Sequence, residues 1–392
     1  MTFWFRISRP RLLNHVIDNV VRTREIICES SLLGVGNLYL FRSLASHRAP
    51  NTKTPHSRKR NCAARWSAGS LAAIGLMTLT GCGELPQTIM DPAGNDARLI
   101  RDLFIPILWI ALAIFIAVEG FLVISMIKYR QRSDNDAIPV QTHGNTRLEI
   151  VWMVVPAIIV AVLAFMTFRT MAVQAEAPGD DALVVEVSGN QWWWEFNYPE
   201  LGIVTANELY LPVGQEVDVR LSSDNVLHSF WLPKLAGKLD VVPGVINKMK
   251  FTPERIGEYF GQCAEFCGLA HAQMRMKAFV VAQADFDRWV QIQLSGASPE
   301  LATSAGAQVF QANCAACHSI KGTTATFGQL GPELTAIGLR TTLGAGIIDH
   351  TPETMAEWIR DPSKIKPGVL MPTLDLSETD IDALVTYLEN MR

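Results

Sequence analysis

Four metal-binding side chains fall within twelve residues of one another in the stretch Gly261-Gln-Cys-Ala-Glu-Phe-Cys-Gly-Leu-Ala-His-Ala-Gln-Met274. They are Cys263, Cys267, His271 and Met274. Thiolate and thioether are soft ligands, and imidazole suits copper as well as zinc. A structural zinc site is closed by four Cys or His ligands and needs no methionine. A His and Cys site with a weak axial Met is typical of copper electron transfer, so the stretch predicts a copper centre.

One histidine for two cysteines predicts a doubled copper site that takes a second imidazole from elsewhere in the chain. The candidate is His228, in the apolar, strand-like run Val226-Leu-His-Ser-Phe-Trp231. Two thiolates can then each bridge two coppers, and each copper keeps one histidine, His228 or His271. Met274 supplies one weak axial contact, and the backbone carbonyl of Glu265 supplies the other. A disulfide or a structural zinc loop is the alternative interpretation.

The donor order Cys-x-Glu-x-Cys-Gly-x-x-His-x-x-Met resembles the dinuclear CuA centre of cytochrome c oxidase subunit II. The resemblance implies a cupredoxin fold and six copper-binding residues, namely His228, Cys263, Glu265, Cys267, His271 and Met274. It also implies that the Glu265 side chain binds a non-redox Mg or Mn ion shared with subunit I. Asp240 lies in the matching neighbourhood, whereas Val245 stands where many relatives have an arginine.

Length, charge and cysteine usage restrict the class of protein. A chain of 392 residues is long enough for two or three domains. The net charge of −4 hides an asymmetry, since residues 1–81 hold 12 Lys and Arg against three Asp and Glu, and the remainder carries −13. An acidic body argues against nucleic acid as a partner and suits basic proteins. Four of the seven cysteines fall in ligand-spaced pairs, which indicates cofactor chemistry.

Residues 1–81 are interpreted as a leader. Residues 1–60 are basic and patternless, and they represent either a disordered segment or a mis-called start. A basic stretch then precedes a short apolar run at 71–79, which is typical of a secretory signal peptide. The ending Leu79-Thr-Gly-Cys82 resembles a bacterial lipobox, which implies a lipid on Cys82. A chance cysteine is the alternative.

The segment 82–176 contains two apolar spans, at about 103–127 and 150–171, each long enough to cross a bilayer. The loop between them is rich in Lys and Arg, and acidic residues follow the second span. By the positive-inside rule the loop is cytoplasmic. The N-terminus and the later domains are therefore expected on the outer, periplasmic side of a bacterial cell membrane.

Two carboxylates of this hairpin are notable. Glu119 lies inside the first span, where an ionised group is costly, and it is interpreted as pairing at a subunit interface. Glu149 opens the second span in Glu149-Ile-Val-Trp-Met-Val-Val-Pro156, which resembles the second helix of A-type oxidase subunit II. The resemblance implies proton entry at Glu149. The alternative is an acidic residue favoured by the helix dipole at a helix N-terminus.

Residues 177–294 are predicted to form the cupredoxin-like domain. Alternating strands are expected at 184–187, 192–198, 208–211, 216–221 and 248–251, with Pro and Gly turns between them, as in a β-sandwich or small barrel. A second family landmark is Gln191-Trp-Trp-Trp-Glu-Phe-Asn-Tyr198. Trp192 matches the exposed tryptophan through which the family accepts electrons, and core or interface packing is the alternative.

A polar linker, 295–304, precedes a third domain, 305–392. There, Cys314-Ala-Ala-Cys317-His318 matches the attachment signature of c-type haem. Cys314 and Cys317 are expected to form thioethers, and His318 is expected to bind iron. A redox dithiol is the alternative for a lone Cys-x-x-Cys, but the following histidine and the exported location oppose it.

The sixth iron ligand is expected at Met371, in Lys366-Pro-Gly-Val-Leu-Met-Pro372, where the prolines stiffen an extended loop. A Met and His ligand pair raises the haem potential. Met355, in a predicted helix, and His350 are the rivals.

The C-terminal stretch Ser377-x-x-Asp380 predicts a helix start. One apolar face follows, made of Ile381, Leu384, Val385 and Leu388. It is expected to cross the helix that contains Val309 and Phe310, as in class I cytochromes c.

Over about residues 100–392 the chain resembles subunit II of a haem–copper cytochrome c oxidase with a fused cytochrome c, the caa3-like arrangement. The expected fold class is a multi-domain membrane protein with a two-helix transmembrane hairpin, an all-β cupredoxin-like domain and an all-α class I cytochrome c domain. The resemblance implies electron flow from cytochrome c or another external donor, through covalent haem c and CuA, to subunit I. That subunit carries haem a and haem a3–CuB and reduces O2 to water with proton translocation, and subunit III is a further implied partner. A CuA-containing nitric oxide reductase subunit and a membrane-tethered electron shuttle are the alternatives.

Overall fold

The computed structural model describes residues 85–130, 141, 143–326 and 328–392. All described residues belong to one compact unit, Cys82–Arg392. The predicted leader, signal peptide and lipidated Cys82 lie outside the described residues.

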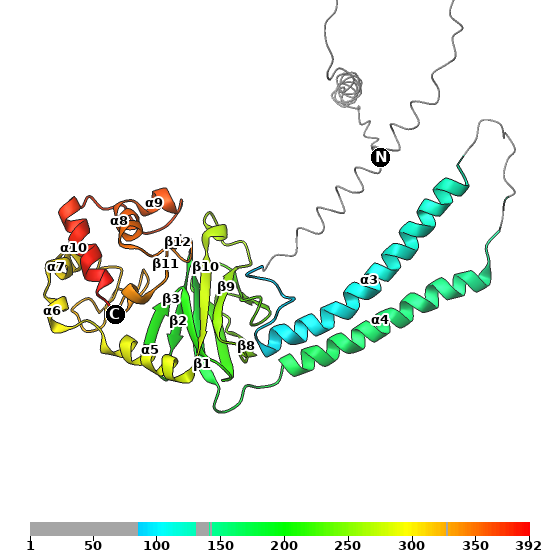
Figure 1. Ribbon diagram of the computed structural model, residues 1–392, viewed down its shortest axis with the longest axis horizontal. Helices are drawn as coiled ribbons and strands as arrows, with labels where there is room; N and C mark the ends of the chain where they lie inside the picture. Colours follow the sequence, from blue (N-terminus) through cyan, green and yellow to red (C-terminus); the bar gives the residue numbers. More distant parts are fainter. Residues whose placement is uncertain (1–84, 131–140, 142, 327) are drawn as a thin grey trace, which may run out of the picture. The chain divides into compact units, whose positions relative to one another are not determined.

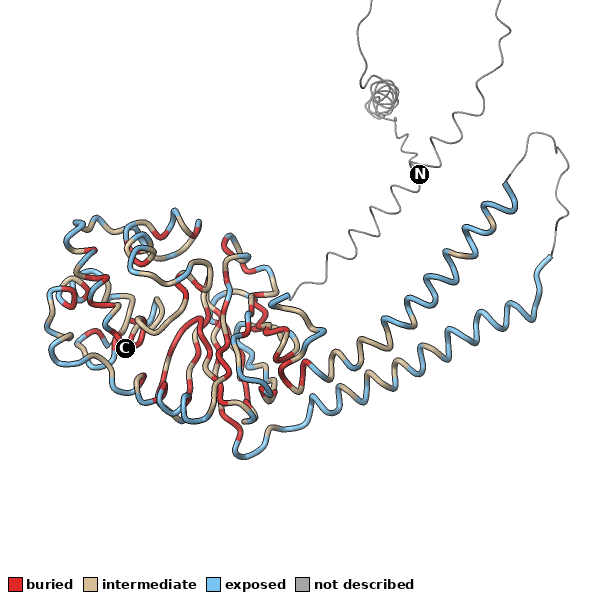
Figure 2. The backbone as a smooth tube through the Cα atoms, viewed as in Figure 1, coloured by how far each residue is buried: buried red, intermediate tan, exposed pale blue. Residues whose placement is uncertain are grey.

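Two long helices, α3 (Asn95–Lys128) and α4 (Thr146–Gln174), form the predicted hairpin (Figure 1). Each contains an apolar window long enough to span a membrane, and no residue in either window is buried. Figure 2 shows both helices in the colours of exposed and intermediate residues along nearly their whole length. Exposed apolar surface on this scale is unfavourable in water, and it is expected to face lipid or another membrane subunit.

Both helices extend beyond the predicted spans because polar residues anchor their ends. Asp96, in the first turn of α3, is buried, and its carboxylate accepts hydrogen bonds from the Gly237 N–H at 2.8 Å and from Gln174 Nε2 at 2.7 Å. The start of α3, the end of α4 and the β domain are thereby joined. Asn145 caps the start of α4 by accepting from two backbone N–H groups of its first turn.

The segment 183–281 forms two five-stranded sheets that enclose one hydrophobic core (Figure 1). Their strand orders are β3-β2-β1-β5-β8 and β4-β10-β9-β6-β7. The pairs β1–β5 and β4–β10 are parallel, and the other neighbouring strands are antiparallel. The strands are β1 Leu183–Asn190, β2 Trp193–Tyr198, β3 Ile203–Ala206, β4 Glu208–Pro212, β5 Val217–Ser223, β6 His228–Trp231, β7 Lys238–Val241, β8 Asn247–Phe251, β9 Gly257–Cys263 and β10 Arg275–Val281. The predicted cupredoxin-like β domain is confirmed.

Alternating burial accompanies two of the strands that the sequence pattern predicts. In β1 and β2 buried and half-buried residues alternate along the whole strand, because one face packs in the core and the other does not. Each of the five expected strands overlaps an observed one. The strands β9 and β10 were not predicted, although they flank the Cys-rich loop. Glycines and charged residues interrupt β9, and β10 contains three consecutive buried residues.

The C-terminal segment is helical, with α7 (Ala305–Asn313) and α10 (Glu378–Glu389) crossing closely as predicted. Gly306 lies at the crossing, and a Cβ there would overlap the Ala383 carbonyl and the Tyr387 side chain. The Phe310 and Tyr387 rings pack with centroids 5.8 Å apart. The remaining elements are α5 Gln283–Ser295, α6 Pro299–Ala302, α8 Pro352–Arg360, α9 Pro362–Ile365 and a small hairpin of β11 Thr342–Leu343 and β12 Ile348–Asp349.

The helical segment contacts the β domain through a buried carboxylate. Glu208, at the start of β4, is 1% exposed. Its Oε1 accepts four hydrogen bonds, from the backbone N–H and the hydroxyl of both Thr341 and Thr342, at 2.7–3.1 Å. Lys277, on β10, donates to the Thr341 hydroxyl at 3.0 Å. Hydrogen bonds to a charged group are stronger than neutral ones, so this contact fixes how the two folded parts meet.

Candidate copper and haem sites

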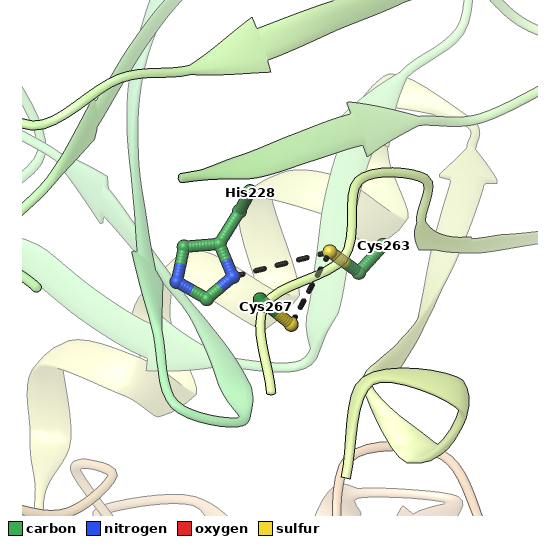
Figure 3. Close-up of side chains that lie close together, drawn as sticks. All are labelled: His228, Cys263 and Cys267. Atoms are coloured by element: carbon green, nitrogen blue, oxygen red, sulfur yellow. Dashed lines mark hydrogen bonds between the residues drawn. The ribbon is translucent and has the colours of Figure 1, made fainter. Parts of the chain in front are cut away.

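Three of the predicted copper ligands converge from two strands and the loop that follows them (Figure 3). His228 begins β6, Cys263 ends β9, and these neighbouring strands are paired in the same sheet. Cys263 Sγ lies 3.9 Å from His228 Nδ1 and 3.8 Å from Cys267 Sγ. All three residues are buried, and their ligand atoms lie within 4.8 Å of one another. The paired thiols and one imidazole therefore form a compact cluster of soft donors.

The remaining predicted ligands complete the cluster. His271 Nδ1 lies 3.6 Å and Met274 Sδ 3.9 Å from Cys267 Sγ. On the other side, the backbone carbonyl of Glu265 lies 3.2 Å from Cys263 Sγ. The Cys263 N–H donates to the Met274 carbonyl at 2.8 Å, which closes the base of the loop. Four further donors, from His228, Glu265, His271 and Met274, thus lie around the sulfur atoms of Cys263 and Cys267.

The orientation of the His228 ring is set by its surroundings. Its Nε2 lies 3.0 Å from Asn225 Oδ1, so the amide oxygen accepts a hydrogen bond from the Nε2–H group. This tautomer leaves Nδ1 free to bind a metal. Behind the ring, a Cβ at Gly189 would lie 2.9 Å from the imidazole. The Trp194 indole packs edge-on at a centroid distance of 6.0 Å. A second residue to orient a metal-bound imidazole is typical of protein metal sites.

The two thiols share their protons unequally. The Sγ atoms of Cys263 and Cys267 lie 3.8 Å apart, and this contact lowers the pKa of Cys263 and raises the pKa of Cys267. A lowered pKa at Cys263 favours the thiolate, which is the metal-binding form of cysteine. Two sulfurs, two imidazoles and a thioether are soft and borderline donors, so the residues fit copper.

A cavity of about 390 Å³ lies beside this cluster in the helical segment. It is lined by the predicted haem residues, Cys314, Cys317, His318 and Met371. His318 Nδ1 lies 2.7 Å from the Pro332 carbonyl, so that carbonyl accepts the ring N–H and leaves Nε2 for iron. A Cβ at Gly331 would touch the imidazole at 2.5 Å, which makes glycine necessary there. Burial lowers the pKa of His318, which favours the neutral, metal-binding imidazole. The residues fit a covalently bound haem.

The rivals for the sixth iron ligand are placed differently. His350 does not line the cavity, because its Nδ1 contacts the Arg340 carbonyl at 2.7 Å and its Nε2 contacts Glu389 at 3.0 Å. Met355 lines the cavity, but it lies on α8 and belongs to the hydrophobic core of the segment. Met371 lines the cavity and lies in a bend outside the helices. This placement favours Met371.

Trp192 is buried rather than exposed, which corrects the expectation drawn from the resemblance. Its side chain is 8% exposed, and it lines the haem cavity with Gln191 and Trp193. The indole Nε1–H donates to the Cys267 carbonyl at 3.0 Å. The ring packs against the copper loop, where a Cβ at Gly268 would lie 3.1 Å from it, and it belongs to the hydrophobic core of the β domain.

Comparisons with known proteins agree with this geometry. The family model "Cytochrome C oxidase subunit II, transmembrane domain" matches residues 85–170, and "Cytochrome C oxidase subunit II, periplasmic domain" matches 201–281. The model "Cytochrome c" matches 303–392. Cytochrome c oxidase subunit 2 of Alkalihalophilus pseudofirmus is 38% identical over 324 residues, which cover 80% of this chain and 94% of that protein. The chain belongs to the cytochrome c oxidase subunit II family.

Other members of the family are similar over comparable lengths. Cytochrome c oxidase subunit 2 of Bacillus subtilis is 33% identical over 351 residues, covering 83% of this chain and 98% of that protein. The solved periplasmic domain of subunit II of cytochrome oxidase from Bradyrhizobium japonicum is 28% identical, with a TM-score of 0.30, and the match covers 30% of this chain and 98% of that domain. The subunit II and cytochrome c matches together imply CuA and haem c as cofactors.

Other residues predicted from subunit II lie apart from these centres. The Glu265 carboxylate accepts the Phe266 N–H at 3.1 Å, and Asp240 pairs with Lys238 at 3.7 Å. The only group of His, Cys, Asp and Glu with metal-binding geometry in the described part of the chain is the copper cluster. Glu149 is exposed in the first turn of α4, a position that fits both of its interpretations.

Sequence reasoning missed residues that support the ligands rather than bind metal. Asn225, Glu208, Arg340 and Lys366 all carry contacts within or between the sites. A usable signal existed for Asn225, because an amide three residues before a ligand histidine, in a turn, is within reach of its ring. Lys366 directly precedes the Pro-Gly of the loop that leads to Met371. Nothing in the local sequence indicates that its side chain contacts the Trp192 and Gly344 carbonyls.

Loss of the Asn225 amide is expected to weaken copper binding. In Asn225→Ala the Nε2 proton of His228 loses its acceptor, so the imidazole loses its fixed tautomer and orientation. We expect copper affinity to fall about 10- to 100-fold, the usual effect of removing such a partner. Copper retained by the purified oxidase against a graded chelator measures the effect. Asp224→Ala, an exposed neighbour in the same turn, is the control and should match wild type. Equal copper retention by Asn225→Ala and wild type would contradict the assignment.

Proposed function

We propose that this chain is the electron-accepting subunit of a membrane-bound haem–copper cytochrome c oxidase, receiving electrons from an external donor and passing them to subunit I. There, O2 is reduced to water with proton translocation. The observation that carries the proposal is the placement of the sulfur-rich cluster and the haem cavity against each other, with Trp192 contacting both. The names of the relatives support the oxidase over the nitric oxide reductase and shuttle alternatives.

The residues of the chain perform positioning rather than bond chemistry. When bound, the copper pair and the haem supply reversible one-electron redox chemistry. His228, Cys263, Cys267 and His271 would hold the copper pair, with Met274 and the Glu265 carbonyl as weaker donors. Cys314 and Cys317 would anchor the haem covalently, and His318 and Met371 would bind its iron. Because these donors come from paired strands or from loops with closed bases, their positions change little between oxidation states.

The orientation and the partners are part of the proposal. The basic loop between α3 and α4 supports a cytoplasmic loop, with the copper and haem domains outside. Lipidation at Cys82, a signal peptide within 1–81, subunit III and a cytochrome c donor belong to the same proposal. An Mg or Mn ion at Glu265, with Asp240 as a second candidate, stays a prediction that requires subunit I to complete the site.

Removal of one bridging sulfur tests the proposed function. In Cys263→Ser the hard hydroxyl cannot replace the soft thiolate. We expect the purified complex to lose the paramagnetic signal shared by two coppers and to lose O2 consumption, while its haem c remains reducible by an external donor. Ala264→Ser introduces the same side chain one position further along the loop and should behave as wild type. Normal O2 consumption by Cys263→Ser would contradict the proposal.

Two methionine variants separate the candidates for the sixth iron ligand. Met371→Leu removes the thioether with little change in volume, so we expect the ferric haem spectrum to change and the haem c potential to fall, because a Met and His pair raises it. Met355→Leu removes a core thioether and should leave both properties unchanged. Redox titration of haem c in the intact complex checks this. The reverse result would assign the ligand to Met355.

The proton-entry assignment of Glu149 is tested by Glu149→Gln. The neutral amide cannot carry a proton, so we expect slower turnover and weaker proton pumping in the assembled oxidase. Oxygen uptake and pH change in reconstituted vesicles measure both. Unchanged turnover and pumping would leave Glu149 as a residue that only stabilises the start of α4.

A further inference from the structure

Lys366 is a buried lysine at the boundary between the haem domain and the copper domain. It is 2% exposed, and it lies in the loop that leads to Met371. Its Nζ donates to the Trp192 carbonyl of the copper domain at 2.7 Å and to the Gly344 carbonyl of the haem domain at 2.9 Å. One ammonium group therefore ties together three segments that are distant in sequence.

This arrangement is costly for stability alone. Burial lowers the pKa of Lys366 to about 7. No Asp or Glu among the described residues forms an ion pair with this lysine. A buried charge without a paired carboxylate is unfavourable, and an apolar side chain of similar volume would usually be more stable. We therefore attribute the buried amine to the position in which its two hydrogen bonds hold the loop of Lys366.

The segments that Lys366 joins also touch the ligand loops of both centres. The Trp192 indole donates to the carbonyl of Cys267, a proposed copper ligand. A Cβ at Gly268 would lie 3.1 Å from the Trp192 ring, and a Cβ at Gly368 would lie 2.7 Å from the Leu269 side chain. Glycine at 268 and 368, both with positive φ, lets the copper loop and the haem loop approach this closely.

We propose that Lys366 is a positioning residue for electron transfer between the haem and the copper pair, holding the Met371 loop against Trp192 and the copper-ligand loop. The inference rests on the proposed function. Lys366 touches neither metal. It acts through two carbonyl groups, and it is separate from the Glu208 contact, which fixes the domains through β4 and β11. Hydrogen bonds are directional, so two of them to fixed carbonyl groups allow only one position of the loop that contains Lys366 and Met371. Apolar packing alone would allow several positions.

The test uses Lys366→Met, which removes the three donors while nearly preserving the length of the side chain. In the intact oxidase carrying haem c and copper, we expect backbone hydrogen exchange in 366–371 to quicken about tenfold, which corresponds to 1.4 kcal/mol. We also expect electron transfer from haem c to the copper pair to slow several-fold, with the copper spectrum unchanged. Lys364→Met, at an exposed lysine two residues earlier, is the matched control and should leave both measurements at wild-type values.

The outcomes are distinguishable from a failure of the proposed function. If wild type itself transfers no electrons from haem c to copper, the proposed function is wrong. If wild type does so and Lys366→Met matches it in exchange and in rate, the positioning role is overturned. Should Lys366→Met fail to incorporate haem, Lys366→Gln is measured in the same way. Its shorter side chain cannot reach both carbonyls, so a slower rate supports the role and an unchanged rate overturns it.

Discussion

Trp192 is the contact on which the redox part of the structure depends. Its indole N–H donates to the Cys267 carbonyl inside the copper loop, and its own backbone carbonyl accepts from Lys366 in the haem domain. The ring also lines the haem cavity. A single residue therefore contacts the copper loop and lines the haem cavity.

The copper cluster forms because the pairing of β6 with β9 places its ligands at one end of the β domain. His228 begins β6 and Cys263 ends β9, and these two strands pair, so the two side chains meet without any dedicated interaction between them. The hydrogen bond from the Cys263 N–H to the Met274 carbonyl then closes a loop in which every remaining donor faces the sulfurs. A rigid sheet with ligands on its loops is a common way to hold a metal in fixed geometry.

Much of this organisation could be predicted, and the limit has a physical cause. Ligand spacing in 263–274, the Cys-x-x-Cys-His signature and the two apolar spans are local in sequence, so they were recognisable without a fold. The alternating strands β1 and β2 were predicted. The strand β9 was missed because two glycines weaken its apolar pattern, although its burial alternates, and β10 was missed because three consecutive buried residues mask the period of two.

Contacts between distant segments could not be predicted from the sequence. Glu208 meets Thr341 and Thr342, and Lys366 meets Trp192, across separations of more than a hundred residues. No local pattern encodes which surfaces of two domains will meet. The burial of Trp192, for which core or interface packing was the alternative interpretation, likewise depends on contacts between distant segments, such as the indole hydrogen bond to the Cys267 carbonyl.

The most direct test of the account is the transfer of one electron inside the intact oxidase after light-triggered reduction of haem c, with no soluble cytochrome present. If the haem domain faces the copper cluster within the same molecule, haem c oxidation and copper reduction will share one first-order rate that does not change when the complex is diluted. A rate that falls in proportion to the concentration of the complex, or haem c that stays reduced while copper stays oxidised, would contradict the account.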